Sequence, residues 1–139
     1  MFTTLKKLEV VAAIIVHDDK ILCMQRDFSK YDYISYTFEF PGGKVEQDES
    51  NSQALKRELF EEMEMDVNIT EQNYYLTVTH NYPDFEITLH FYMIKVDNPY
   101  FIQKVHISHK WLKRDELATL NWAPADELII ERLIEEQHE

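Results

Sequence analysis

The sequence is poor in the features that mark several large classes of protein. It has a single cysteine, Cys23, so no intrachain disulfide can form, which fits a reducing cytoplasm. No apolar run approaches the length of a membrane-spanning helix, and no signal peptide opens the chain. We find no repeat, low-complexity segment or internal linker. We therefore expect one globular domain over residues 1–139, with Cys23 in its core and no membrane partner.

Basic residues are also scarce. Lysine and arginine number 14 against 26 acidic residues, and the net charge is −12. A protein that grips long nucleic acid usually carries a basic patch, and none is visible here. A single nucleotide remains compatible with this charge, because a bound metal ion can bridge phosphates to carboxylates. The composition indicates a small-molecule partner and implies no protein partner.

Glycine is also rare in this sequence. The chain has two glycines, Gly42 and Gly43, and they are adjacent. Glycine serves backbone conformations that other residues avoid, or the close approach of a ligand. We interpret the pair as a tight turn after a short strand at 38–41.

A helix signal follows the glycines. Ser50 and Gln53 have the spacing of a capping box. Leu55, Leu59 and Met63 then recur every four residues, which predicts an amphipathic helix with one face in the core.

Three carboxylates gather on one flank of this helix. At about 100° per residue, Glu58, Glu61 and Glu62 fall within an arc of roughly 100°. Like charges at this spacing repel one another. The run is typical of a solvated acidic face. It also suits a hard cation such as Mg²⁺, which takes oxygen ligands.

The spacing between the glycines and the helix carries a resemblance. Gly43, Glu49 and the segment R-E-L-F-E-E at 57–62 resemble the Nudix signature, G-x5-E-x7-R-E-U-x-E-E-x-G-U, where U is a bulky apolar residue. One position departs, because Glu64 stands where the pattern has glycine. We expect that residue to end the helix, so the change alters the exit turn more than the metal site. V-V-A-A-I-I-V, E-F-P-G-G-K, I-T-L-H-F and A-P-A-D extend the resemblance to MutT and the CTP pyrophosphohydrolases over nearly the whole chain.

The resemblance implies an α/β fold, the Nudix alpha/beta/alpha sandwich with a mixed β-sheet between helices, which the order of predicted strands and helices also suits. It implies hydrolysis of a nucleoside triphosphate between the alpha and beta phosphates, giving a monophosphate and pyrophosphate. The implied metal ligands for Mg²⁺, or alternatively Mn²⁺, are the Gly42 carbonyl, Glu58, Glu61 and Glu62. Related enzymes often add a late-loop glutamate, but 103–111 reads Q-K-V-H-I-S-H-K-W. His106 would substitute there, or is an exposed or core histidine.

The catalytic assignments follow from the same resemblance. A carboxylate must take a proton from the attacking water. We favour Glu58 as this base, with Glu49 as helper or alternative. Arg57 is expected to pair with a carboxylate and orient it.

Three further residues are candidate nucleotide ligands. The resemblance to the MutT branch implies a phosphate-contacting arginine at Arg26 and a base-reading residue at Asp126, and Lys44 follows the glycines, where it can reach a phosphate. Arg26 and Lys44 would meet phosphate, or are surface cations. Asp126 would read the base, or is an acidic residue stabilised at a helix N-terminus. A carboxylate accepts hydrogen bonds only, so it suits the cytosine amino group or the N1 and N2 hydrogens of an oxidised guanine. A-P-A-D favours the cytidine reading. Tyr31, Tyr33 and Tyr36 would stack on a base or pack on the surface.

Two other functions remain open. One is hydrolysis of another nucleoside diphosphate derivative, such as ADP-ribose, NADH or a nucleotide sugar. The other is a non-catalytic nucleotide-binding regulatory domain, although such a domain would be free to lose its carboxylates.

The remaining predicted elements are strands at 10–16, 21–26, 85–96 and 105–112, a strand ending at 81, a loop at 27–37 and a helical turn at 113–117. A helix is predicted from Pro124 to about Gln137, with Leu128, Ile129, Leu133 and Ile134 facing inward.

Overall fold

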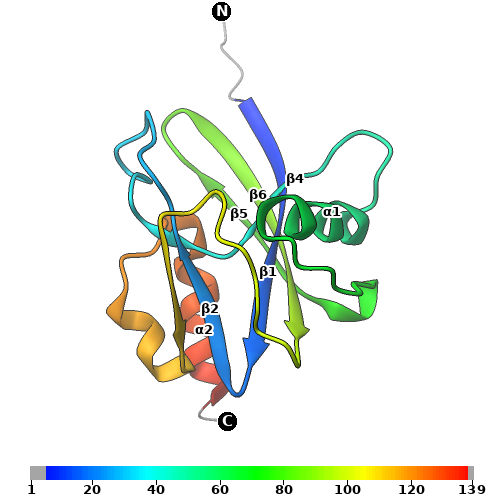
Figure 1. Ribbon diagram of the computed structural model, residues 1–139. Coiled ribbons are helices and arrows are strands. Elements are labelled where there is room, and N and C mark those ends of the chain that lie inside the picture. The colour runs from blue at the N-terminus through cyan, green and yellow to red at the C-terminus, as the bar shows by residue number, and fades with distance from the viewer. Residues whose placement is uncertain (1–5, 138–139) are drawn as a thin grey trace, which may run out of the picture.

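A computed structural model describes residues 6–137 (Figure 1). Its strands form one mixed seven-stranded sheet in the order β3-β2-β1-β6-β5, with β4 paired to β1 and β7 paired to β2. The β1–β6 pair is parallel, and the other pairs are antiparallel. The strands are β1 Lys6–His17, β2 Lys20–Gln25, β3 Phe38–Glu39, β4 Gly42–Lys44, β5 Tyr74–Asn81, β6 Phe85–Lys95 and β7 Ser108–Leu112; the α-helices are α1 Asn51–Met63 and α2 Glu127–Gln137.

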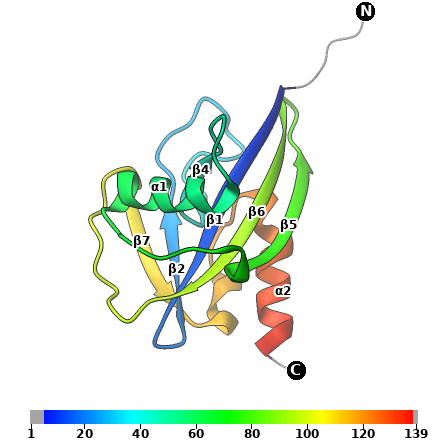
Figure 2. The ribbon, with the colours of Figure 1, turned by 90° about the vertical axis from the view of Figure 1, so that its right-hand side faces the viewer.

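The sheet lies between the two helices, and β1 contributes to both layers. Its alternate side chains point to opposite faces, as a strand requires. Val11, Ala13 and Ile15 pack with α1, whereas Ala12 and Ile14 pack with α2. Figure 2 shows α1 and α2 on opposite sides of the sheet. The alpha/beta/alpha sandwich with a mixed sheet is therefore confirmed.

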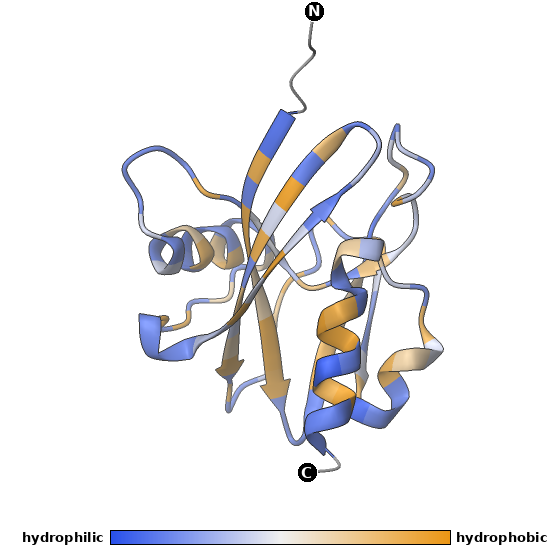
Figure 3. Ribbon diagram, turned by 180° about the vertical axis from the view of Figure 1, so that it is seen from behind, coloured by the Kyte–Doolittle hydropathy of each residue, from blue (hydrophilic) through white to orange (hydrophobic). Residues whose placement is uncertain are grey.

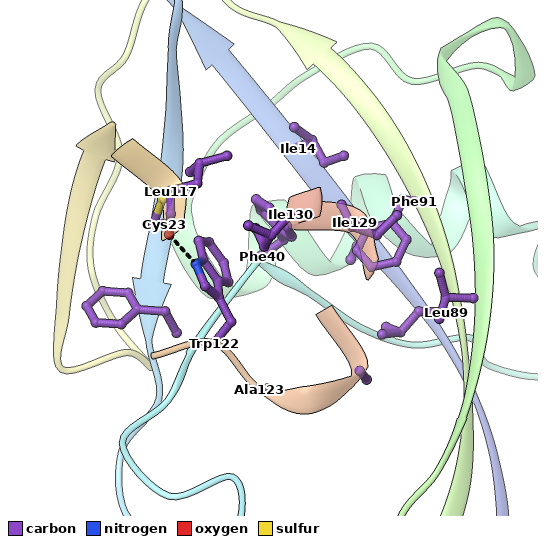
Figure 4. Close-up of a cluster of buried hydrophobic side chains, with 14 of the residues drawn as sticks. Ile14, Cys23, Phe40, Leu89, Phe91, Leu117, Trp122, Ala123, Ile129 and Ile130 are labelled. Carbon is purple, nitrogen blue, oxygen red and sulfur yellow. Dashed lines mark hydrogen bonds between the residues drawn. The ribbon is translucent and has the colours of Figure 1, made fainter. Parts of the chain in front are cut away.

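Each helix buries one stripe. The buried side of α1 holds Ala54, Leu55, Leu59 and Met63. Figure 3 shows both helices with mixed hydrophobic and hydrophilic residues, as amphipathic helices have. On the α2 side, Trp122 lies beside Phe40 in the buried cluster of Figure 4, and its indole N–H donates to the Leu117 carbonyl at 2.7 Å.

Cys23 belongs to the cluster on the α2 side. It is fully buried, and burial raises the pKa of its thiol to about 12. The prediction of a core cysteine is confirmed.

The inward face of α2 differs from the prediction. Ile129, Ile130 and Leu133 are buried, whereas Leu128 is 61% exposed. The cause is a 3₁₀ turn at Pro124–Asp126, which precedes the α-helix and sets its rotation. At about 100° per residue, Leu128 then lies on the far side from the centre of the buried stripe. Ile134 is half-buried.

Some strand limits also differ from the prediction, since β1 covers Lys6–His17 instead of 10–16 and β3 ends at Glu39 instead of 41. β7 begins at Ser108, not at 105, because β2 offers only five partners, Ile21–Gln25, for pairing. β5 begins at Tyr74 after a 3₁₀ turn at Glu71–Asn73. The helical turn predicted at 113–117 is the 3₁₀ helix Arg114–Thr119. None of the helices described within residues 6–137 is long and apolar enough to cross a membrane.

Helix α1 begins and ends as its sequence predicts. Ser50 is the N-cap, and a reciprocal capping box joins it to Gln53. Glu64 is the C-cap in the left-handed conformation, with φ 52° and ψ 33°, and its N–H bonds back to the helix. This position favours glycine, so a side chain here costs about 1 kcal/mol. Glu64 thus ends the helix, as predicted, in the conformation that the glycine of the signature would favour.

Candidate active site

The two glycines do not form the predicted tight turn. They lie in β4, which pairs antiparallel with β1, and neither has a positive φ. Their requirement is space. A Cβ at Gly42 would lie 1.9 Å from the Val11 carbonyl oxygen, and one at Gly43 would lie 2.3 Å from Cδ of Glu58. The strand therefore packs directly against both the sheet and the acidic flank of α1.

Arg57 gathers the carboxylates of the signature. Its guanidinium donates twice to Glu49, with Nη2–Oε1 at 2.7 Å and Nε–Oε2 at 3.1 Å. Nη1 donates to Glu58 Oε1 at 2.8 Å and to Glu61 Oε2 at 3.1 Å. The hydrogen bonds from Arg57 lower the pKa of Glu49. Arg57 thus holds the strand-to-helix connection against the acidic face of α1.

Glu62 lies on the side of this cluster nearest the sheet. Its Oε2 is buried and has no hydrogen-bond partner among the described residues. Burial, together with the charges of Glu58 and Glu39, raises the pKa of Glu62 to about 8, against an opposing hydrogen bond from the Gly42 backbone. An orphaned buried carboxylate oxygen beside another acid is the environment that a cation relieves.

The donor set therefore fits a hard divalent cation in chemistry, because it consists of oxygen atoms only. Within residues 6–137, no three acidic, histidine or cysteine side chains converge as a ready ligand shell. Arg57 instead occupies oxygens of Glu58 and Glu61. Glu61 is also 58% exposed, whereas Glu58 is 15% exposed. Glu58 and Glu62 are thus the inner candidates, and Glu61 lies further out.

A cavity of about 430 Å³ adjoins the glycines on the opposite side of β4. It brings together all three predicted nucleotide ligands, Arg26, Lys44 and Asp126, together with Gly42 and Gly43. Tyr31 also lines it, whereas Tyr36 is exposed on the surface. The rest of the lining is mainly apolar and includes Leu8, Val10, Ala12, Ile34, Phe40, Phe85, Ile87, Leu89, Ala123 and Ala125.

Asp126 is a buried acidic residue in the lining of this cavity, which Glu39 also lines. It is 5% exposed, and no hydrogen bond joins its carboxyl group to the rest of residues 6–137. Burial raises the pKa of Asp126 well above its usual range, the charge of Glu39 adds to this, and Arg26 opposes it. A neutral carboxylic acid donates as well as accepts. Burial therefore disfavours the ionised, acceptor-only form of Asp126, and its role as a reader of the base stays a prediction.

Replacing Asp126 with Asn is expected to stabilise the ligand-free protein increasingly as the pH rises. Because the pKa of Asp126 is raised in the folded state, the folded protein holds this proton more tightly than the unfolded chain does. The resulting contribution to folding stability is complete below the unfolded pKa of about 3.9, and it is lost as the pH rises through the folded pKa. The loss is at most about 1.4 kcal/mol per pH unit between the two values. Urea unfolding of both proteins from pH 5 to 9 measures the difference. Parallel curves would contradict the raised pKa.

Sequence reasoning missed Glu39, the centre of a second charged group. Its Oε1 accepts from Arg26 Nη1 and its Oε2 from His106 Nε2, both at 2.9 Å. Burial opposes ionisation of Glu39, but the hydrogen bond from His106 and the charge of Arg26 outweigh it, so its pKa is lowered. His106 is buried, as the core alternative predicted. The available signal for Glu39 was the segment E-F-P-G-G-K, of which it is the first residue.

With the geometry established, comparison with known proteins decides the family. A model of the NUDIX domain matches residues 10–132. The chain belongs to the Nudix family. The 8-oxo-dGTP diphosphatase of Escherichia coli K12 is 30% identical over 131 residues, which cover 93% of this chain and 98% of the relative.

Two further known proteins are similar to this chain. The CTP pyrophosphohydrolase of E. coli K12 is 51% identical over 67 residues, 48% of each chain. The solution structure of the E. coli ORF135 protein superposes with a TM-score of 0.74 at 34% identity, covering 96% of this chain and 92% of that one. The chain is thus a MutT-like Nudix hydrolase, an enzyme that acts on phosphoric anhydride bonds.

Proposed function

We propose that this Nudix hydrolase converts a nucleoside triphosphate and water to a monophosphate and pyrophosphate in a Mg²⁺-dependent reaction, with Mn²⁺ as an alternative metal. The observation that carries the proposal is the continuous site described above. The cavity is lined by Asp126, Gly42 and Lys44, and Gly43 in the same strand borders the Glu58 carboxyl group on α1.

The cavity is lined by both apolar and charged residues, and this combination supports a nucleotide as its ligand. The apolar lining suits a base, and the unpaired carboxyl group of Asp126 supplies hydrogen bonds to its edge. Arg26 and Lys44 supply positive charge for phosphate. The substrates proposed are CTP or dCTP and 8-oxo-dGTP, the classes named for two of the relatives.

The metal would be held by the Gly42 carbonyl, Glu58 and Glu62, with Glu61 as an outer ligand. When bound, such a cation neutralises phosphate oxygens and acidifies a coordinated water. Glu58 accepts the proton of the attacking water, while Arg57 fixes its orientation through the 2.8 Å hydrogen bond. Glu49 is the weaker candidate base, because both of its oxygens accept from Arg57 and its pKa is lowered. Glu49 instead holds Arg57 in place.

A nucleotide panel with and without Mg²⁺ tests the proposal. Pyrophosphate release from CTP, dCTP or 8-oxo-dGTP, abolished by a chelator and restored by Mg²⁺, is the expected result. Turnover of ADP-ribose or NADH alone would refute the proposed substrate class. Binding of nucleotides without any turnover would favour a regulatory domain.

A further inference from the structure

Asp126 is anchored by a residue from a distant part of the chain. The backbone N–H of Ala125, immediately before Asp126, donates to the hydroxyl oxygen of Tyr82 at 3.0 Å. Tyr82 lies in the connection between β5 and β6, is 6% exposed and itself lines the cavity. The Tyr82 hydroxyl, which comes from the β5–β6 connection, thus restrains the 3₁₀ turn that carries Asp126.

The ring of Tyr82 is held in place by other aromatic rings. It stacks on Tyr33 with centroids 5.0 Å apart and planes 16° apart, and Tyr33 stacks on Tyr31 at 5.5 Å. Phe85 packs against Tyr82 at 5.0 Å. Tyr33 is fixed in turn, since its hydroxyl donates to Asp84 Oδ2 at 2.7 Å. These contacts leave the Tyr82 hydroxyl little freedom to follow a displaced turn.

We propose that Tyr82 is a positioning residue for base selectivity, which fixes the Asp126 carboxyl group at the depth and angle required to read a base edge. This inference rests on the proposed function of the cavity. Base recognition depends on hydrogen bonds of about 2.7–3.2 Å with good alignment. A small displacement of Asp126 would therefore weaken the cognate base most, because only that base forms well-aligned bonds.

The effect is confined to the base end of the site. Arg26 directly follows β2 and Lys44 ends β4, and within residues 6–137 neither side chain hydrogen-bonds to Tyr82 or Ala125. Burial raises the pKa of the Tyr82 hydroxyl, and the charge of Arg26 does reach this hydroxyl and opposes the shift. Glu58 lies on α1, on the other side of the sheet. The loss of the Tyr82 hydroxyl should therefore raise KM for the preferred nucleotide and leave kcat within about twofold.

Tyr82→Phe tests the inference, because it removes the hydroxyl and keeps the stacked ring. Tyr74→Phe is the matched control, since Tyr74 starts β5, does not line the cavity, and hydrogen-bonds through its hydroxyl to Thr77 at 2.6 Å. Binding of CMP, UMP, AMP, dGMP and 8-oxo-dGMP is measured by calorimetry, and kcat and KM are measured for the matching triphosphates. We expect the ratio of affinities between the best and the worst base to fall about tenfold in Tyr82→Phe, the scale of one hydrogen bond. Tyr74→Phe should keep the wild-type ratio.

The outcomes separate this inference from the proposed function. Unchanged selectivity in Tyr82→Phe, or an equal loss of affinity for every base, would overturn the positioning role. Failure of the wild type to bind any monophosphate would also overturn it. If the wild type binds monophosphates selectively but hydrolyses no triphosphate, the proposed function fails, and the affinity ratios still decide the role of Tyr82.

Discussion

Replacement of Glu58 by Gln is expected to lower kcat at least about 100-fold, the usual scale for loss of a general base. The amide keeps the shape of the side chain but cannot take the proton from water. The Glu58 side chain is only 15% exposed and lies against Arg57 and Gly43, so the substitution removes a negative charge that solvent screens little. Steady-state kinetics with the best nucleotide of the panel, at saturating Mg²⁺, provides the measurement.

Glu131→Gln is the matched control for this variant, because Glu131 is exposed on α2 and lies outside the site. It should retain wild-type kcat. Circular dichroism should show both variants folded. A Glu58→Gln protein with near-normal turnover would remove Glu58 from the role of base and leave Glu49 as the candidate.

Gly42→Ala is expected to produce the largest loss of stability, about 3 kcal/mol or more, at the upper end of the usual cost of overpacking. The added Cβ would overlap the Val11 carbonyl oxygen at 1.9 Å, and a backbone atom in the middle of a sheet cannot move aside without breaking the β1–β4 pairing. Thermal unfolding in the absence of nucleotide measures the effect, and the midpoint should fall by roughly 10 °C.

Gly43→Ala is the informative comparison, because the same added methyl group meets a different neighbour. Its Cβ would contact the carboxyl end of the Glu58 side chain, which can rotate away. We therefore expect a much smaller change in unfolding temperature but a clear loss of kcat, since the displaced carboxylate leaves its position beside Arg57. Equal destabilisation by the two alanines would contradict the separate roles assigned to these glycines.

Local sequence patterns predicted α1 well, because its signals lie within the helix itself. The capping box at Ser50 and Gln53 and the stripe through Leu59 depend on contacts between residues three or four positions apart. The resemblance to the Nudix signature added the pairing of Arg57 with carboxylates. The wider resemblance to the MutT branch supplied Arg26 and Asp126, and the position after the glycines indicated Lys44. The structure brings all three to one cavity.

The features that sequence reasoning missed depend on contacts between distant residues. The crowding at Gly42 comes from Val11 across the sheet, so no local pattern distinguishes it from a turn glycine. Glu39 meets His106 only because β2 pairs with both β3 and β7. Helical periodicity alone predicted Leu128 on the inward face of α2. It is exposed, because the 3₁₀ turn before α2 changes the rotation of the helix.

The parallel pairing of β1 with β6 has a consequence for biosynthesis. Lys6 lies opposite Phe85 and Val16 opposite Lys95, so the two strands are about 80 residues apart in the chain. As the chain leaves the ribosome, β1 can pair with β2 and β4 early, but one edge of it stays open until β6 has emerged. Closure of long-range pairs of this kind is slow. A nascent chain that stops short of residue 95 would therefore present an apolar strand with a vacant edge, the sort of segment that chaperones shield.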